Sequence, residues 1–130
     1  MTQKSLATNY NAMEIFSVKN KVVFITGSSR GVGREIAMAF LKLKAVVIGV
    51  SRNENKSIKH KNYYHLVCDL KNYQALKHTA NQAFKIKKKI DVIINNAGIT
   101  EEEQKDFYKS FKSFNKTLNV NLTAPYVISH

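Results

Sequence analysis

A short apolar run followed by a glycine-rich segment is the feature that most constrains this chain. The run at 22–25, Val-Val-Phe-Ile, leads directly into 26–33, Thr-Gly-Ser-Ser-Arg-Gly-Val-Gly, and an amphipathic stretch follows. This pattern predicts a buried strand, a tight turn and a helix. The unpaired N–H groups and the positive dipole end of such a helix favour bound phosphate. Segment 26–33 therefore predicts a site for a nucleotide pyrophosphate.

Each glycine of this segment has its own expected task. Gly27 can take backbone angles that other residues avoid in a tight turn. Gly31 leaves room for phosphates to approach the main chain, and Gly33 allows the helix to pack closely on the strand.

Apolar segments alternate between strand and helix patterns along the rest of the chain. Runs rich in β-branched residues predict strands at 21–25, 45–50, 63–68 and 90–94. Helices are predicted at 32–43, at 72–86 and from Glu101 onward, with a polar loop at 53–62. This alternation favours an α/β fold with a parallel sheet and helices on both faces.

Apolar residues recur at helical spacing in the predicted helices. They are Val32, Ile36, Phe40 and Leu43 in the first; Tyr73, Leu76, Ala80 and Ala83 in the second, with Tyr73 expected on the core side; and Phe107, Phe111, Phe114, Leu118 and Leu122 in the last. The acidic residues 101–103 are expected at the start of the last helix, where they complement its dipole. Lys44 stands where a glycine commonly ends a helix, and a left-handed backbone there costs about 1 kcal/mol.

Length and composition indicate one globular domain. The chain has 130 residues, of which 44% are hydrophobic and 23% charged. Residues 1–12 are polar and predict a disordered tail, which leaves 13–130 as the domain. No apolar run is long enough to span a bilayer, and no secretory signal is apparent. The single cysteine, Cys68, excludes an internal disulfide and is typical of a reducing compartment, so a cytoplasmic location is predicted. Cys68 itself is expected in the core.

The net charge of +12 does not by itself predict a nucleic-acid or membrane partner. The excess is mostly lysine spread along the chain, and the dense run at 85–89 is interpreted as a solvated connection. The three arginines are more localised: Arg30, Arg34 and Arg52 all lie in the part of the chain, from the glycine turn to the end of the second predicted strand, that is assigned to cofactor phosphates. The histidines show no metal-ligand spacing, and no metal is expected.

Four segments in order resemble the short-chain dehydrogenase/reductase family: Thr26-Gly-x-x-x-Gly-x-Gly33, Cys68-Asp69-Leu70, Asn95-Asn96-Ala97-Gly98 and Asn119-Val120-Asn121-Leu122. The resemblance covers about 13–130 and is closest to the 3-oxoacyl-acyl-carrier-protein reductase branch. It implies a Rossmann-like, doubly wound parallel sheet of strand order 3-2-1-4. It also implies an oxidoreductase that reduces carbonyls or oxidises alcohols with a nicotinamide cofactor.

The resemblance also implies roles for particular residues. The pyrophosphate and adenosine ribose would be held by Gly27, Ser28, Ser29, Arg30, Gly31, Val32 and Gly33. Asp69 and Leu70 would contact the adenine, and Asn95 and Ala97 would line the cofactor groove. Asn121 matches the asparagine that kinks the next helix and anchors a water of the proton relay.

The end of the second strand predicts which cofactor is used. NAD enzymes place a carboxylate there for the ribose 2′-hydroxyl. This chain has Ser51 followed by Arg52, with Arg30 in the glycine turn. Because guanidinium groups bind phosphate in a fork-like manner, NADP is predicted. The alternative is that both arginines are simply solvated.

The family's catalytic serine and its Tyr-x-x-x-Lys pair would follow Asn121, and the sequence ends at His130. Two such pairs occur earlier, Tyr73 with Lys77 and Tyr108 with Lys112, and both are misplaced. We therefore expect a fold truncated after the fourth strand and the following helix, with that strand at an unpaired edge and with little activity alone. The family's usual homo-oligomer interface would also be cut short. The alternatives are a non-catalytic nucleotide-binding module, half of a two-chain enzyme, and last a nucleic-acid-binding protein.

Overall fold

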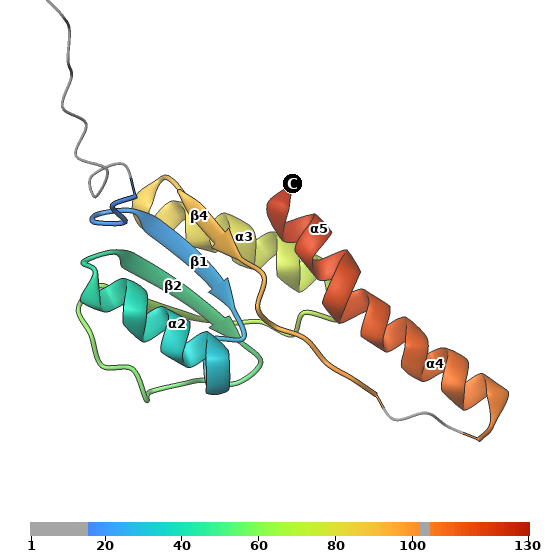
Figure 1. Ribbon diagram of the computed structural model, residues 1–130. Coiled ribbons are helices and arrows are strands. Elements are labelled where there is room, and N and C mark those ends of the chain that lie inside the picture. The colour runs from blue at the N-terminus through green and yellow to red at the C-terminus, as the bar shows by residue number, and fades with distance from the viewer. Residues whose placement is uncertain (1–15, 102–104) are drawn as a thin grey trace, which may run out of the picture.

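A parallel four-stranded sheet forms the centre of the molecule in the computed structural model, which describes residues 16–101 and 105–130. Its order is β3 (Tyr63–Val67), β2 (Val46–Ser51), β1 (Val22–Thr26) and β4 (Val92–Ile94). Figure 1 shows β2, β1 and β4 side by side. The predicted Rossmann-like sheet of order 3-2-1-4 is confirmed. The tail predicted at 1–12 lies outside the described residues.

Helices cover both faces of the sheet (Figure 1). Helix α2 (Gly31–Lys42) packs on the face that receives Val23 and Ile25 of β1. Helices α3 (Tyr73–Lys87) and α5 (Ala124–Ser129) pack on the opposite face, with Val22 and Phe24. Because both faces are buried, β1 is continuously apolar from Val22 to Ile25 rather than alternating.

The buried face of α2 differs from the apolar stripe of the sequence. The buried residues are Gly33, Ala37 and Leu41, whereas Val32 and Leu43 are exposed. At Gly33 the reason is steric, because an added Cβ would overlap the Gly27 carbonyl and the Asn96 side chain. Ile36 and Phe40 of the predicted stripe are partly buried against the core, so these two positions agree with the sequence pattern.

Tyr73 was expected on the core side of α3, and that prediction is wrong. Its side chain is 54% exposed, while Leu76, Thr79 and Ala83 are buried. Tyr73 is the first residue of the helix, directly after Asn72, whose side chain accepts a hydrogen bond from the Ala75 N–H at 3.0 Å. The first turn therefore extends past the edge of the core.

The last helix begins later than the sequence pattern indicates. Helix α4 (Phe107–Leu118) starts after Asp106, whose carboxylate accepts a hydrogen bond from the Lys109 N–H at 2.9 Å. Glu101 precedes the helix and pairs with Lys116 at 3.4 Å, while Glu102 and Glu103 lie outside the described residues. The acidic start predicted at 101–103 is therefore wrong for Glu101, because the Asp106 cap fixes the first turn.

A π-helical turn, η1 (Asn119–Thr123), joins α4 to α5. Figure 1 shows α4 extending beyond the sheet. The aromatic stripe of α4 is consequently exposed, at Phe107, Phe111 and Phe114.

Other local expectations are confirmed. Lys44 has a φ of 64°, as its position at the end of α2 predicts. Cys68 follows β3 directly and is 3% exposed within the core. Strand β4 is hydrogen-bonded to β1 and forms one edge of the sheet. Among the described residues, no helix is both long and apolar enough to cross a membrane.

Candidate functional site

A cleft of about 520 Å³ opens where the strands of the sheet end, which is where open α/β sheets bind ligands. Five segments that are far apart in the chain surround it: the glycine-rich turn, the end of β2, the residues after β3, the residues after β4, and η1. Its lining residues are Gly27, Ser29, Arg30, Gly31, Val50, Ser51, Arg52, Asn53, Cys68, Asp69, Leu70, Asn96, Ala97, Gly98, Ile99 and Val120. Most of the predicted cofactor residues are therefore brought together.

The glycines of the turn meet the steric demands of a phosphate cradle. Gly27 and Gly31 have φ values of 70° and 54°, which side-chain-bearing residues rarely adopt. A Cβ added at Gly31 would meet no atom within 4 Å, so the main chain is open on that side. A Cβ at Gly33 would overlap the Gly27 carbonyl and the Asn96 side chain. Gly33 thus keeps α2 seated on the turn without itself lining the cleft.

The N-terminus of α2 has no side-chain cap. Its N-cap residue Arg30 is extended, with φ −155° and ψ 170°, and makes no capping hydrogen bond. The first turn of α2 also contains no acidic residue. The first N–H groups of α2 are therefore free of intrahelical and capping partners at the rim of the cleft, as an anionic ligand requires. The backbone, its open side and its dipole all fit a pyrophosphate.

Asn96 fixes the turn, and the residue-by-residue assignment missed it. Its Nδ2 donates hydrogen bonds to the carbonyls of Thr26 and Gly27, at 3.1 and 3.3 Å. The neighbouring Ala97 N–H donates to Thr26 Oγ1 at 3.1 Å. The Asn-Asn-Ala-Gly motif itself was the available signal, although its partners 70 positions away are visible only in the fold.

Several predicted site residues do not line the cleft. Ser28 is fully buried beneath the turn and contacts the Tyr63 hydroxyl at 3.2 Å. Val32 points outward and is 71% exposed. Asn95 donates to Ser129 Oγ at 3.3 Å.

Asn121 lies within the π-helical turn and clamps the segment after β4. Its Oδ1 accepts a hydrogen bond from the Ile99 N–H at 2.9 Å, and its Nδ2 donates to the Ile99 carbonyl at 2.8 Å. Ile99 itself lines the cleft. Asn121 therefore fixes Ile99, a residue of the cleft wall, although Asn121 is not itself among the lining residues.

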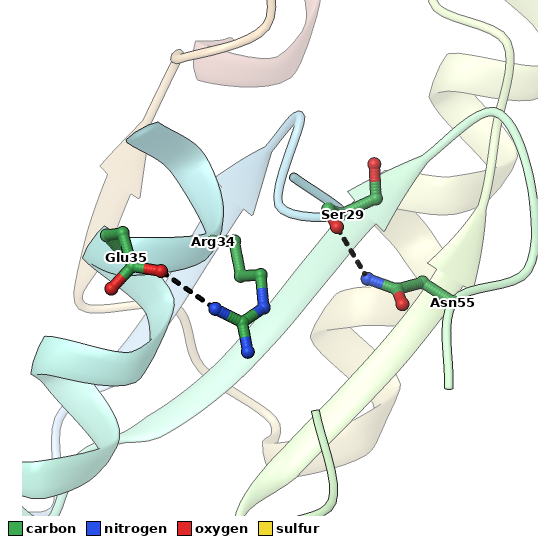
Figure 2. Close-up of polar contacts among 4 residues, drawn as sticks. All are labelled: Ser29, Arg34, Glu35 and Asn55. Atoms are coloured by element: carbon green, nitrogen blue, oxygen red, sulfur yellow. Dashed lines mark hydrogen bonds and ion pairs between the residues drawn. The ribbon is translucent and has the colours of Figure 1, made fainter. Parts of the chain in front are cut away.

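The arginines of the sequence separate into two groups. Arg30 and Arg52 line the cleft and are exposed. Arg34 instead pairs with its neighbour Glu35 at 2.7 Å, as Figure 2 shows. Arg34 is not among the residues that line the cleft, contrary to its assignment to the phosphate segment, and its guanidinium pairs with Glu35 instead.

None of the tyrosines that the structure describes is among the residues that line the cleft. In the described part of the chain, Tyr73 and Tyr108 are on α3 and α4 and are 54% and 81% exposed. Burial raises the pKa of the Cys68 thiol, which disfavours a reactive thiolate. Within residues 16–101 and 105–130, no group of His, Cys, Asp and Glu could hold a metal ion.

Comparisons with known proteins agree with this architecture. The family model described as short chain dehydrogenase matches residues 21–130. A 3-oxoacyl-acyl-carrier-protein reductase of Buchnera aphidicola subsp. Schizaphis graminum is 31% identical over 118 residues, which are 86% of this chain and 48% of the relative. The chain thus spans about half the length of the curated relatives it matches.

The solved structures similar to this chain include proteins with bound cofactor. A metagenomic short-chain oxidoreductase in complex with NADP is 26% identical with a TM-score of 0.76, over 86% of this chain and 54% of that one. A short chain dehydrogenase from Leptospira borgpetersenii with bound NAD+ is 26% identical with a TM-score of 0.73, over 87% and 44%. Nicotinamide cofactors with and without a 2′-phosphate are therefore both found on this fold.

Proposed function

Because this chain belongs to the short-chain dehydrogenase family, we propose that its cleft binds NADP(H) in preference to NAD(H). The cofactor would serve carbonyl reduction or alcohol oxidation. The glycine-rich turn would hold the pyrophosphate, while Asp69 and Leu70 would contact the adenine on the far side of the cleft.

The observation that carries this proposal is the polar end of β2. Ser51 and Arg52 line the cleft there, and Arg30 lines it from the glycine turn. A carboxylate at the end of β2 would repel a 2′-phosphate, whereas a hydroxyl and two guanidinium groups can bind one. The ion pairs among the described residues engage neither Arg30 nor Arg52, so both are available.

A titration of NADPH fluorescence tests the proposal. We expect saturable binding and weaker binding of NADH. Arg52→Gln should weaken NADPH about tenfold, since it removes a charge-assisted contact to phosphate, and should leave NADH nearly unchanged. Arg34→Gln is the matched control, because Arg34 already pairs with Glu35. Equal affinity for the two cofactors, or no saturation by about 1 mM, would overturn the proposal.

We also propose that these 130 residues bind the cofactor without turning over substrate. The support is that none of the described tyrosines lines the cleft, so the type of acid–base group that the family uses is not found beside it. The same observation favours the alternative of a nucleotide-binding module, or of one half of a two-chain enzyme. The test is an NADPH oxidation assay with carbonyl substrates, and any turnover above background would contradict this part.

A further inference from the structure

A ring of hydrogen bonds joins the glycine-rich turn, β3 and the loop after β2. On one side, the Ser28 hydroxyl contacts the Tyr63 hydroxyl at 3.2 Å, and that hydroxyl contacts His65 Nδ1 at 3.2 Å. His65 Nε2 then lies 3.1 Å from the Asn53 carbonyl and 3.2 Å from Ser51 Oγ. Ser51 and Asn53 both line the cleft, so the ring reaches its wall.

The ring closes through Asn55, at the far end of the same loop. Its Nδ2 donates a hydrogen bond to the Ser29 carbonyl at 3.2 Å, which Figure 2 shows between the loop and the glycine turn. Loop 51–55 is therefore fixed to His65 at one end and to the turn at the other. Arg52 is carried on this loop.

The partners determine the direction of the hydrogen bonds. The Asn53 carbonyl can only accept, so we assign the proton of His65 to Nε2, the tautomer in which this contact is a hydrogen bond. In the neutral ring Nδ1 is then an acceptor, and the Tyr63 hydroxyl donates to it. Burial raises the pKa of Tyr63, which keeps that hydroxyl protonated and able to donate. Ser28 in turn donates to Tyr63.

The fold leaves room for this ring. A Cβ added at Gly49 of β2 would overlap Ser28 Oγ and the Tyr63 hydroxyl. Ser28 is completely buried, so its hydroxyl is cut off from water and needs its protein partner. Any larger residue at position 49 would break the contact between the turn and β3.

We propose that His65 is a positioning residue that sets the affinity of the cleft for the 2′-phosphate of NADP. This inference rests on the proposed function. Ser51 Oγ now donates to the Asn53 carbonyl at 2.8 Å. Because His65 also donates to that carbonyl, Ser51 can turn its hydroxyl proton to a phosphate without leaving the carbonyl unpaired. His65 also holds the loop that carries Arg52.

The test compares adenosine 2′,5′-bisphosphate with 5′-AMP by titration calorimetry, using the whole 130-residue chain. We expect His65→Leu to weaken the bisphosphate about fivefold to tenfold, the effect of one lost hydrogen bond, and to change 5′-AMP less than about twofold. His65→Gln, whose amide N–H can replace Nε2–H, should recover most of the preference. His78→Leu is the matched control, because His78 is exposed on α3.

The possible results distinguish a failure of the positioning role of His65 from a failure of the proposed preference for NADP. If the wild-type chain does not prefer the bisphosphate, the NADP proposal itself fails. If it does, and His65→Leu keeps that preference or weakens both ligands equally, the positioning role is overturned. Should His65→Leu fail to fold, Tyr63→Phe is the second test. It keeps the aromatic side chain of residue 63 and removes the hydroxyl that contacts His65 Nδ1. An unchanged preference in that variant would also overturn the inference.

Discussion

Gly33 shows how one residue can reverse the usual effect of a substitution. Replacing glycine by alanine inside a helix ordinarily stabilises it by about 1 kcal/mol. At position 33 the added Cβ would overlap the Gly27 carbonyl, a backbone atom that cannot move aside alone. The steric effect should exceed the helix propensity.

Gly33→Ala is therefore expected to destabilise the chain by about 1–3 kcal/mol, the usual range for overpacking. It should also weaken NADPH binding, because the turn must shift. Urea unfolding and the fluorescence titration measure the two effects. A stabilised variant would show that the turn is more loosely packed than the structure indicates.

The residue types at the site could be anticipated from sequence, but their partners could not. The motifs identified Asp69, Ala97 and the glycines of segment 26–33. These residues line the cleft, except Gly33, which packs against the glycine turn. Ser28 was assigned to the cofactor because it lies within a motif, yet it faces Tyr63 from beneath the turn. Which side of a tight turn a residue faces depends on strands that are distant in the chain.

At the scale of elements, β4 is held to β1 by a side-chain hydrogen bond in addition to the backbone hydrogen bonds between the two strands. The Asp91 carboxylate accepts a hydrogen bond from the Val22 N–H at 2.7 Å and pairs with Lys89 at 2.9 Å. These contacts lower the pKa of Asp91, the backbone hydrogen bond most of all. The start of the edge strand is thereby fixed beside the start of the central one.

The lowered pKa of Asp91 predicts a pH dependence of stability. Because the folded-state pKa lies below the unfolded value of about 3.9, the contribution is present above that pH and is lost as the pH falls through the folded pKa. Asp91→Asn should lower Tm at pH 7 and differ little from wild type near pH 2.

Thermal unfolding at the two pH values checks this, with Asp106→Asn as a control that retains a capping oxygen on another element. A Tm difference for Asp91→Asn that is the same at both pH values would contradict the assignment.

Helix and strand positions were predictable within a few residues, because hydrophobic spacing reports burial directly. The exceptions have local causes. The start of α4 depends on the Asp106 cap, which outweighs the acidic run before it. At Gly33 the buried face of α2 depends on how closely the helix approaches the glycine turn, and apolar spacing does not identify a buried glycine.

At the scale of the whole molecule, the strand order followed from the family resemblance and not from apolar spacing. The molecule also displays an exposed apolar surface along α4, formed by Phe107, Phe111 and Phe114. Exposed apolar patches and open sheet edges promote association between molecules.

We expect the 130-residue chain to associate as its concentration rises, and Phe111→Gln with Phe114→Gln to reduce this. Light scattering over a concentration series measures the effect. Lys112→Gln, an exposed change on the same helix, is the control for altered polarity. Equal scattering from the double variant and the wild type would show that association uses a surface other than the aromatic face of α4.

The position of β4 beside β1 also has a consequence for the order of folding. Val22 and Asp91 are 69 positions apart, whereas β1 and β2 are neighbours joined through one helix. Closing the longer loop costs more chain entropy, so β4 should dock after β1, α2 and β2 have assembled. Pulsed hydrogen exchange should then protect the amides of β2 before those of β4. Since Asn96 and Ala97 follow β4, the binding cleft becomes complete only in the last step of folding.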